Sequence, residues 1–138
     1  MLEAEEAASA SVGFVAAAAE EEGAVTTSSG LVYLELTAGS GESPTAENKV
    51  KVHYEGKLSN GAIFDSSYSR GEPSEFKLNQ VIPGWTEGLA MMKPGGKARL
   101  TIPSNLAYGP METGSIPGNS ALQFEVELLE IKESGWFD

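Results

Sequence analysis

The stretch that decides the fold lies between residues 50 and 109, where apolar and aromatic residues are punctuated by glycine. Its segments are V-K-V-H-Y-E-G-K-L (50–58), N-G-A-I-F-D-S-S (60–67), V-I-P-G-W-T-E-G-L (81–89), G-G-K-A-R-L-T-I-P (95–103) and L-A-Y-G (106–109). The chain has no cysteine, a single histidine and no metal-ligand spacing. This composition predicts a shallow aromatic pocket for a reaction that needs an apolar surface and a few hydrogen bonds.

The residue pattern around this stretch predicts several strands and one short helix. Val50, Val52 and Tyr54 alternate with polar residues, as in a strand with one buried face. The Asn60-Gly61 pair predicts a hairpin, because both residues tolerate positive φ. Further strands are predicted at residues 31–37, 76–78, 98–102 and 122–128, and a helix at 83–92 with one apolar stripe. The fold class is therefore α+β, with the helix against one face of a curved antiparallel sheet.

The N-terminal part has a different composition from the rest. Residues 1–30 contain six acidic residues and no Lys or Arg, and the whole chain of 138 residues has a formal charge of −11. Residues 1–29 are predicted to be an Ala/Glu-rich helical arm and linker, and residues 30–138 the folded domain. The arm is interpreted either as mobile or as a docking or dimerising element. The acidic charge argues against nucleic-acid binding, and the absence of a long apolar run argues against a membrane span.

In order and spacing, the segments resemble the FKBP immunophilins, which are peptidyl-prolyl cis-trans isomerases. The lead-in G-L-V-Y-L-E-L-T-A-G-S-G (30–41) is similar to that of macrophage-infectivity-potentiator-like and chloroplast-lumen members. The resemblance implies an antiparallel half-barrel wrapped around one short helix, with the pocket between them. It also implies the site residues. Catalytic positions would be Tyr54, Phe64, Asp65, Trp85, Tyr108 and Phe124, and substrate-binding positions Arg70, Val81, Ile82 and Ile116.

Within this resemblance, Trp85 would be the pocket floor and Asp65 a carboxylate near the substrate carbonyl, with Arg70 as its ion-pair partner. The expected hydrogen-bond donors to substrate are the Ile82 backbone N–H and the Tyr108 hydroxyl. Some positions depart from better-known members: Ser74 stands where many carry a pocket aromatic, Leu106 where a Tyr is frequent, and the loop 110–120 is about one residue short. These departures concern macrolide affinity and peptide preference more than the basic activity.

Two functions follow from these observations. The first is an isomerase that rotates X-Pro bonds of proline-containing polypeptides without a cofactor, and that binds tacrolimus- or rapamycin-type macrolides. The second is an FKBP-like binding module, or a subunit of a larger assembly such as one in a photosynthetic membrane, with a protein partner on residues 1–22. No intact signal peptide is visible, and a mature form in a thylakoid lumen or periplasm is favoured over a cytosolic protein.

Overall fold

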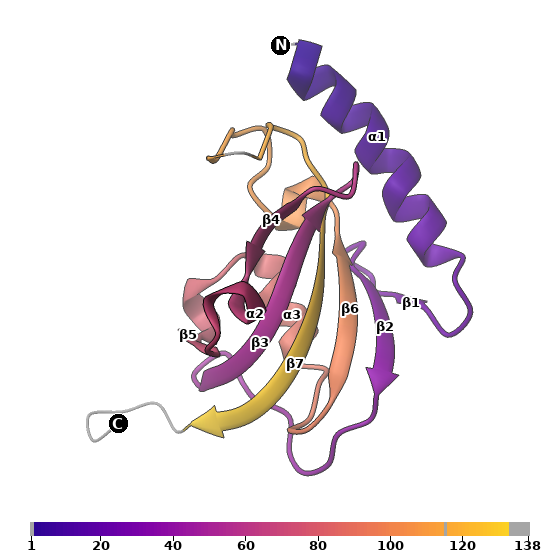
Figure 1. Ribbon diagram of the computed structural model, residues 1–138. Coiled ribbons are helices and arrows are strands. Elements are labelled where there is room, and N and C mark those ends of the chain that lie inside the picture. Colours follow the sequence, from indigo (N-terminus) through magenta and orange to yellow (C-terminus); the bar gives the residue numbers. More distant parts are fainter. Residues whose placement is uncertain (1, 115, 133–138) are drawn as a thin grey trace.

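The computed structural model describes residues 2–114 and 116–132, with side chains from Ala10 onward. Seven antiparallel strands form one curved sheet in the order β1-β2-β6-β7-β3-β4, and β5 also pairs with β3 (Figure 1). The strands are β1 (Val25–Thr26), β2 (Val32–Thr37), β3 (Lys49–Leu58), β4 (Ile63–Ser66), β5 (Ser74–Lys77), β6 (Lys97–Ile102) and β7 (Leu122–Lys132). The helices are α1 (Leu2–Ala19), α2 (Ser67–Arg70) and α3 (Pro83–Leu89), with short 3₁₀ turns η1 (Leu78–Gln80) and η2 (Ser104–Leu106).

The two longest strands, β3 and β7, form the centre of the sheet. β7 pairs with β3 along its full length, and the other edge of β3 pairs first with β5 and then with β4. Every second residue of β3 faces the core, so Val50 and Val52 are fully buried and Tyr54 is 4% exposed. The alternation of apolar and polar residues in the sequence thus determines which face of β3 lines the pocket.

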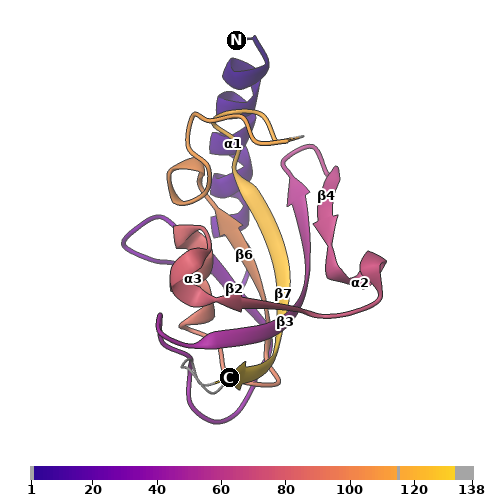
Figure 2. The ribbon, with the colours of Figure 1, turned by 90° about the vertical axis from the view of Figure 1, so that its left-hand side faces the viewer.

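Helix α3 lies against the inner face of the curved sheet (Figure 2). Pro83 occupies the first turn, where its missing N–H is not needed. Gly84 and Gly88, one turn apart, let the helix approach β6 closely. A Cβ at Gly84 would lie 2.5 Å from Ile102, and one at Gly88 would lie 2.8 Å from Leu100. The two glycines therefore set the depth of Trp85 in the core.

Sequence and structure agree on fold class and differ in several local features. The α+β class with an antiparallel sheet is confirmed. Helix α3 ends at Leu89 and not near residue 92, because the Met91 and Met92 N–H groups donate to carbonyls three residues earlier. Gly61 in the hairpin has φ +88°, whereas Asn60 has no positive φ. The structure adds α2, η1 and η2, which were not predicted, and places the short strand β1 inside the segment interpreted as a linker.

Helix α1 lies beside β2 and β6, and its first turns extend past the end of the sheet (Figure 1). Ser11 and Ala18 are the buried residues among its described side chains. Just after the helix, Glu21 pairs with Arg99 of β6 at 3.0 Å. The C-terminal half of α1 is therefore docked on the domain. None of the helices in the described ranges is long and apolar enough to cross a membrane.

Candidate functional site

A cavity of about 440 Å³ opens between α3 and the strands β3, β4, β5 and β7. Its walls are mostly apolar and aromatic. The lining residues are Tyr54, Phe64, Asp65, Phe76, Gln80, Val81, Ile82, Trp85, Tyr108 and Phe124. The structure thus brings together all six positions predicted as catalytic, along with Val81 and Ile82.

The floor of the cavity is an aromatic cluster centred on Trp85, which is 4% exposed. Its indole meets the rings of Tyr54, Phe76 and Phe124 edge to face, at centroid distances of 5.1, 5.4 and 5.2 Å. Phe64 stands perpendicular to Phe124 at 5.5 Å and extends the wall. Edge-to-face pairs fix ring orientation beyond simple burial. The buried Trp85 Nε1–H has no hydrogen-bond acceptor among the described residues, so the floor of the cavity contains one unpaired donor.

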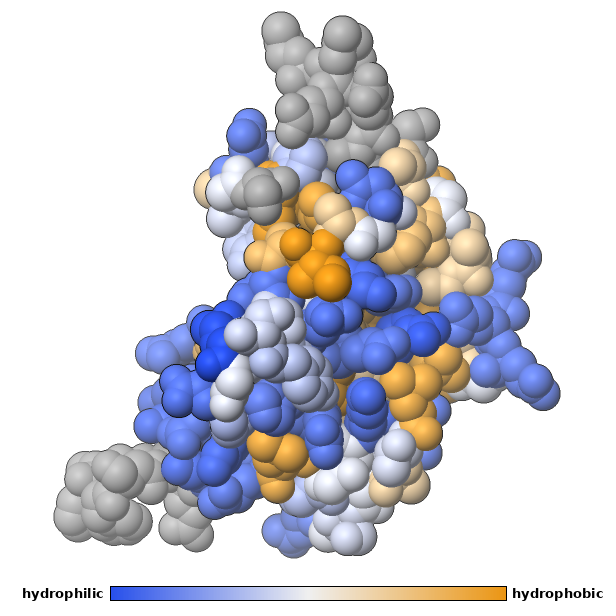
Figure 3. All heavy atoms as spheres, in the orientation of Figure 1, coloured by the Kyte–Doolittle hydropathy of each residue, from blue (hydrophilic) through white to orange (hydrophobic). Residues whose placement is uncertain are grey.

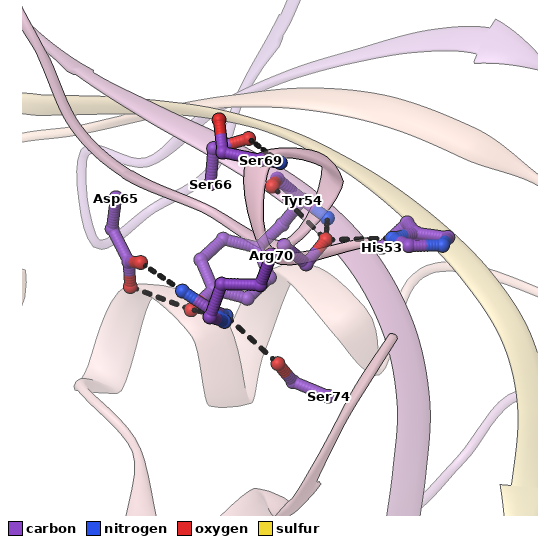
Figure 4. Close-up of polar contacts among 8 residues, drawn as sticks. His53, Tyr54, Asp65, Ser66, Ser69, Arg70 and Ser74 are labelled. Carbon is purple, nitrogen blue, oxygen red and sulfur yellow. Dashed lines mark hydrogen bonds and ion pairs between the residues drawn. The ribbon is translucent and has the colours of Figure 1, made fainter. Parts of the chain in front are cut away.

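One edge of the cavity carries a network of charged hydrogen bonds (Figure 4). The Tyr54 hydroxyl donates to Asp65 Oδ2 at 2.5 Å, and Arg70 Nη1 donates to Asp65 Oδ1 at 2.6 Å. Arg70 Nη2 also donates to the Tyr54 hydroxyl at 3.1 Å and to Ser74 Oγ at 3.0 Å. Each carboxylate oxygen therefore has its own donor, which holds Asp65 in one orientation.

Local structure explains how Arg70 reaches this network. Ser66 caps α2 by accepting a hydrogen bond from the Ser69 N–H, and Gly71 ends the helix with φ +78°. This single turn directs the guanidinium of Arg70 back over the Tyr54 ring, 5.6 Å from its centroid. The predicted Asp65–Arg70 ion pair is present, but Arg70 holds the carboxylate from outside and does not line the cavity.

The network shifts the pKa values of its members. Burial raises the pKa of Tyr54, and the hydrogen bond to Asp65 raises it further. Partial burial raises the pKa of Asp65, but the hydrogen bonds from Tyr54 and Arg70 and the charge of Arg70 outweigh it, so the net shift is downward. At neutral pH the edge of the cavity therefore carries an ionised carboxylate beside a neutral phenol.

Two groups could bind a peptide backbone at the rim. Among the described residues, none accepts a hydrogen bond from the Ile82 N–H, and Ile82 lines the cavity at the start of α3. Tyr108 also lines the cavity and is 39% exposed. Both are the donors expected from the sequence, and both are available to a ligand.

Ile116 is placed differently from the other predicted residues. It is 6% exposed, belongs to the hydrophobic core and is not among the residues that line the cavity. Conversely, Phe76 and Gln80 line the cavity and were not predicted as site residues. Phe76 lies on β5 opposite Val50 of β3, and this pairing points its ring into the cavity. A strand of four residues is too short for its alternation to predict which side chains point inward.

His53 and Ser67 lie behind the pocket. Ser67 is fully buried, and its Oγ accepts from the Tyr54 N–H at 2.7 Å and contacts His53 Nδ1 at 2.7 Å (Figure 4). The His53 ring stacks on Tyr68 at 4.6 Å on the outer side of the sheet. Within residues 2–114 and 116–132, no group of three or more acidic or histidine side chains could hold a metal ion.

Comparison with known proteins agrees with this geometry. Residues 40–129 match the family model described as FKBP-type peptidyl-prolyl cis-trans isomerase. An FkpA isomerase of Aeromonas hydrophila is 52% identical over 120 residues, which are 87% of this chain and 45% of the relative. The chain belongs to the FKBP-type peptidyl-prolyl cis-trans isomerase family, as the sequence predicted.

Solved structures give the same assignment. The crystal structure of FkpA from Escherichia coli superposes with a TM-score of 0.93 at 47% identity, covering 96% of this chain and 62% of that one. A peptidyl-prolyl isomerase from Pseudomonas syringae gives a TM-score of 0.85 at 39% identity, covering 94% and 96%. The chain therefore spans 45% of the Aeromonas hydrophila relative, 62% of the Escherichia coli structure and 96% of the Pseudomonas syringae structure.

Proposed function

We propose that this chain catalyses cis-trans isomerisation of X-Pro peptide bonds in unfolded or partly folded polypeptides. The observation that carries the proposal is the aromatic cavity floored by Trp85, with an ordered carboxylate at one edge. We propose the same division of the chain as above, with an arm in residues 1–29 and the isomerase domain in residues 30–138. Residues 133–138 of that range lie outside the described residues.

The reaction needs no covalent bond between the protein and the substrate. The amide rotation barrier of about 18–20 kcal/mol comes from resonance that keeps the amide planar and charge-separated. A catalyst must bind the twisted amide better than either planar form. Tyr54, Phe64, Trp85 and Phe124 enclose the cavity with apolar surface, which disfavours the charge-separated planar amide and grips the proline ring.

We assign to the polar groups the role of orienting the substrate peptide. The Ile82 N–H and the Tyr108 hydroxyl would hold the peptide that flanks the proline, because both are unpaired at the rim. Asp65 would act through its fixed negative charge near the substrate carbonyl and not as a base, because no proton has to move. Arg70 would keep that carboxylate in place, and Val81 would complete the apolar wall. Ile116, in the core, would support the loop that overhangs the site.

Ligands and compartment are also proposals. Proline-containing polypeptides are the proposed substrates, and tacrolimus- or rapamycin-type macrolides the proposed inhibitors. Ser74 stands where many family members carry an aromatic residue, and its hydroxyl accepts a hydrogen bond from Arg70. The smaller side chain leaves the cavity less enclosed beside Arg70. The bacterial origin of the FkpA relatives favours the periplasm over an organelle lumen, with the cytosol as the remaining alternative.

A protease-coupled assay on a proline peptide tests the proposal. The chain should accelerate the slow phase of cleavage, and a macrolide of the family should abolish the acceleration. A folded chain that gives no acceleration would instead support the second reading, a binding module or assembly subunit. The observation that favours that reading is the docked helix α1, which offers a surface beyond the pocket.

A further inference from the structure

One polar side chain of α1 is inserted into the domain. Ser11 is 7% exposed, and its hydroxyl makes two hydrogen bonds to the backbone of a segment more than 100 residues later. It donates to the Asn119 carbonyl at 3.0 Å and accepts from the Ala121 N–H at 2.6 Å. Ser11 thus joins the N-terminal helix to the end of the loop that leads into β7.

This loop also carries part of the pocket. The Asn119 N–H donates to the Gly109 carbonyl at 2.7 Å, and the Gly109 N–H donates to the Ser104 carbonyl at 2.8 Å. Gly109 directly follows Tyr108, which lines the cavity. A continuous series of hydrogen bonds therefore runs from α1 through Asn119 to the residue next to Tyr108.

Asn119 itself needs support from its surroundings. It has φ +64° and is the only residue other than glycine with positive φ among the described residues. This left-handed conformation is less favourable for a residue with a side chain, although Asn tolerates it better than most. The bond from Ser11 holds the carbonyl of this residue, and the bond to Gly109 holds its N–H, so both sides of the position are fixed.

Packing alone does not hold α1 against the loop. A cavity of about 490 Å³ lies between them, lined by Ser11, Val12, Val15, Ala16, Pro103, Ser104, Asn105 and Asn119. Val12, next to Ser11, is 74% exposed. Figures 1 and 2 both show α1 running past the end of the sheet where this loop lies. With so much open space beside the helix, the two Ser11 hydrogen bonds are the specific connection.

We propose that Ser11 is a positioning residue for the isomerase reaction, acting through Asn119 and Gly109 on Tyr108. The inference rests on the proposed function. It gives the arm that contains helix α1 a part in shaping the pocket. It also implies that anything that displaces α1 changes turnover at the active site.

The test compares Ser11→Ala with Gly13→Ala in the full chain. Ser11→Ala keeps the helix and removes both hydrogen bonds, and misplacement of a binding group by a distant change costs up to about 100-fold in rate. We expect kcat/KM for a proline peptide to fall by roughly five-fold or more. Gly13→Ala changes the same helix without a contact, because a Cβ there meets nothing within 4 Å, so kcat/KM should not change. Ser11→Cys, a weaker hydrogen-bonding group in the same place, should lie between.

A double-mutant cycle separates positioning from general destabilisation. In a Tyr108→Phe background the positioned hydroxyl is absent, so Ser11→Ala should reduce kcat/KM by much less than in the wild type. An equal reduction in both backgrounds, or none in the wild type, would overturn the proposal. As a control, thermal unfolding of each variant is measured, and kinetics are compared only at a temperature well below the unfolding transition of every variant.

A second readout does not depend on activity. In NMR spectra of the folded chain, Ser11→Ala should move the Tyr108 and Gly109 amide signals and speed hydrogen exchange at Ala121. Unmoved Tyr108 and Gly109 signals would overturn the proposal whatever the activity. Failure of the proposed function has a different result: the wild-type chain itself would be inactive in the same assay.

Discussion

Tyr54→Phe tests whether the polar network at the pocket edge is held by the tyrosine hydroxyl. The ring stays, so the aromatic contacts with Trp85 and Phe124 remain. The variant loses the donor to Asp65 at 2.5 Å and the acceptor of the Arg70 bond at 3.1 Å. A hydrogen bond to a charged group contributes about 1.5–3 kcal/mol. Because the Asp65 and Arg70 side chains are 40% and 45% exposed, water compensates part of this.

We therefore expect Tyr54→Phe to lower the free energy of unfolding by about 1–2 kcal/mol at pH 7, or roughly 3–8 °C in Tm for a domain of this size. The assay is urea unfolding followed by tryptophan fluorescence. Tyr33→Phe is the matched control: Tyr33 is 7% exposed, and its hydroxyl makes no hydrogen bond with any described residue. Its effect should stay within about 0.5 kcal/mol.

The pH dependence gives the same prediction a second check. The folded pKa of Asp65 lies below its ordinary value of 3.8, so its ionisation adds stability above that pH, and this contribution is lost as the pH falls through the folded pKa. The variant lacks one of the bonds that lower this pKa. The stability difference between wild type and Tyr54→Phe should therefore be full near neutral pH and shrink below about pH 4. A difference equal to that of Tyr33→Phe, or one that does not change with pH, would refute the reasoning.

Three further substitutions test close packing and a buried hydrogen bond. Gly88→Ala should lower the free energy of unfolding by about 1–3 kcal/mol, because its Cβ would lie 2.8 Å from Leu100. Gly13→Ala, with no neighbour within 4 Å, should instead raise it by up to about 1 kcal/mol, and urea unfolding that ranked the pair in the opposite order would contradict the account. Ser67→Ala should cost about 1–3 kcal/mol, since it removes the buried acceptor of the Tyr54 N–H. A change below about 0.5 kcal/mol in urea unfolding would show that this bond is dispensable.

Most of the fold could be predicted because its strands are amphipathic and its turns are marked. The alternation of Val50, Val52 and Tyr54 identified β3 and its buried face, and Pro83 marked the start of α3. Helix α2 escaped prediction because one turn, capped by Ser66, has no periodicity to read. The short strand β1 escaped because only its pairing with β2 identifies it as a strand.

The site was predicted where a motif carries it and missed where pairing between distant segments decides it. Trp85 and Asp65 lie within contiguous motifs, and the structure places both at the cavity. Phe76 reaches the cavity through the register of β5 on β3, which a four-residue strand does not encode. The contact of Ser11 with Asn119 spans 108 positions of sequence, and one of two serines in an alanine-rich helix gives no signal of such a partner.

The most direct test of the central claim is the cis-trans exchange rate of a short X-Pro peptide, measured by NMR with wild-type chain and with Trp85→Leu. The indole is the floor of the cavity and meets three other rings, so its replacement removes the surface proposed to favour the twisted amide. We predict that the wild type accelerates exchange and that folded Trp85→Leu loses at least about ten-fold of that rate, or 1.4 kcal/mol of transition-state stabilisation. No acceleration by folded wild type, or equal acceleration by both proteins, would contradict the account.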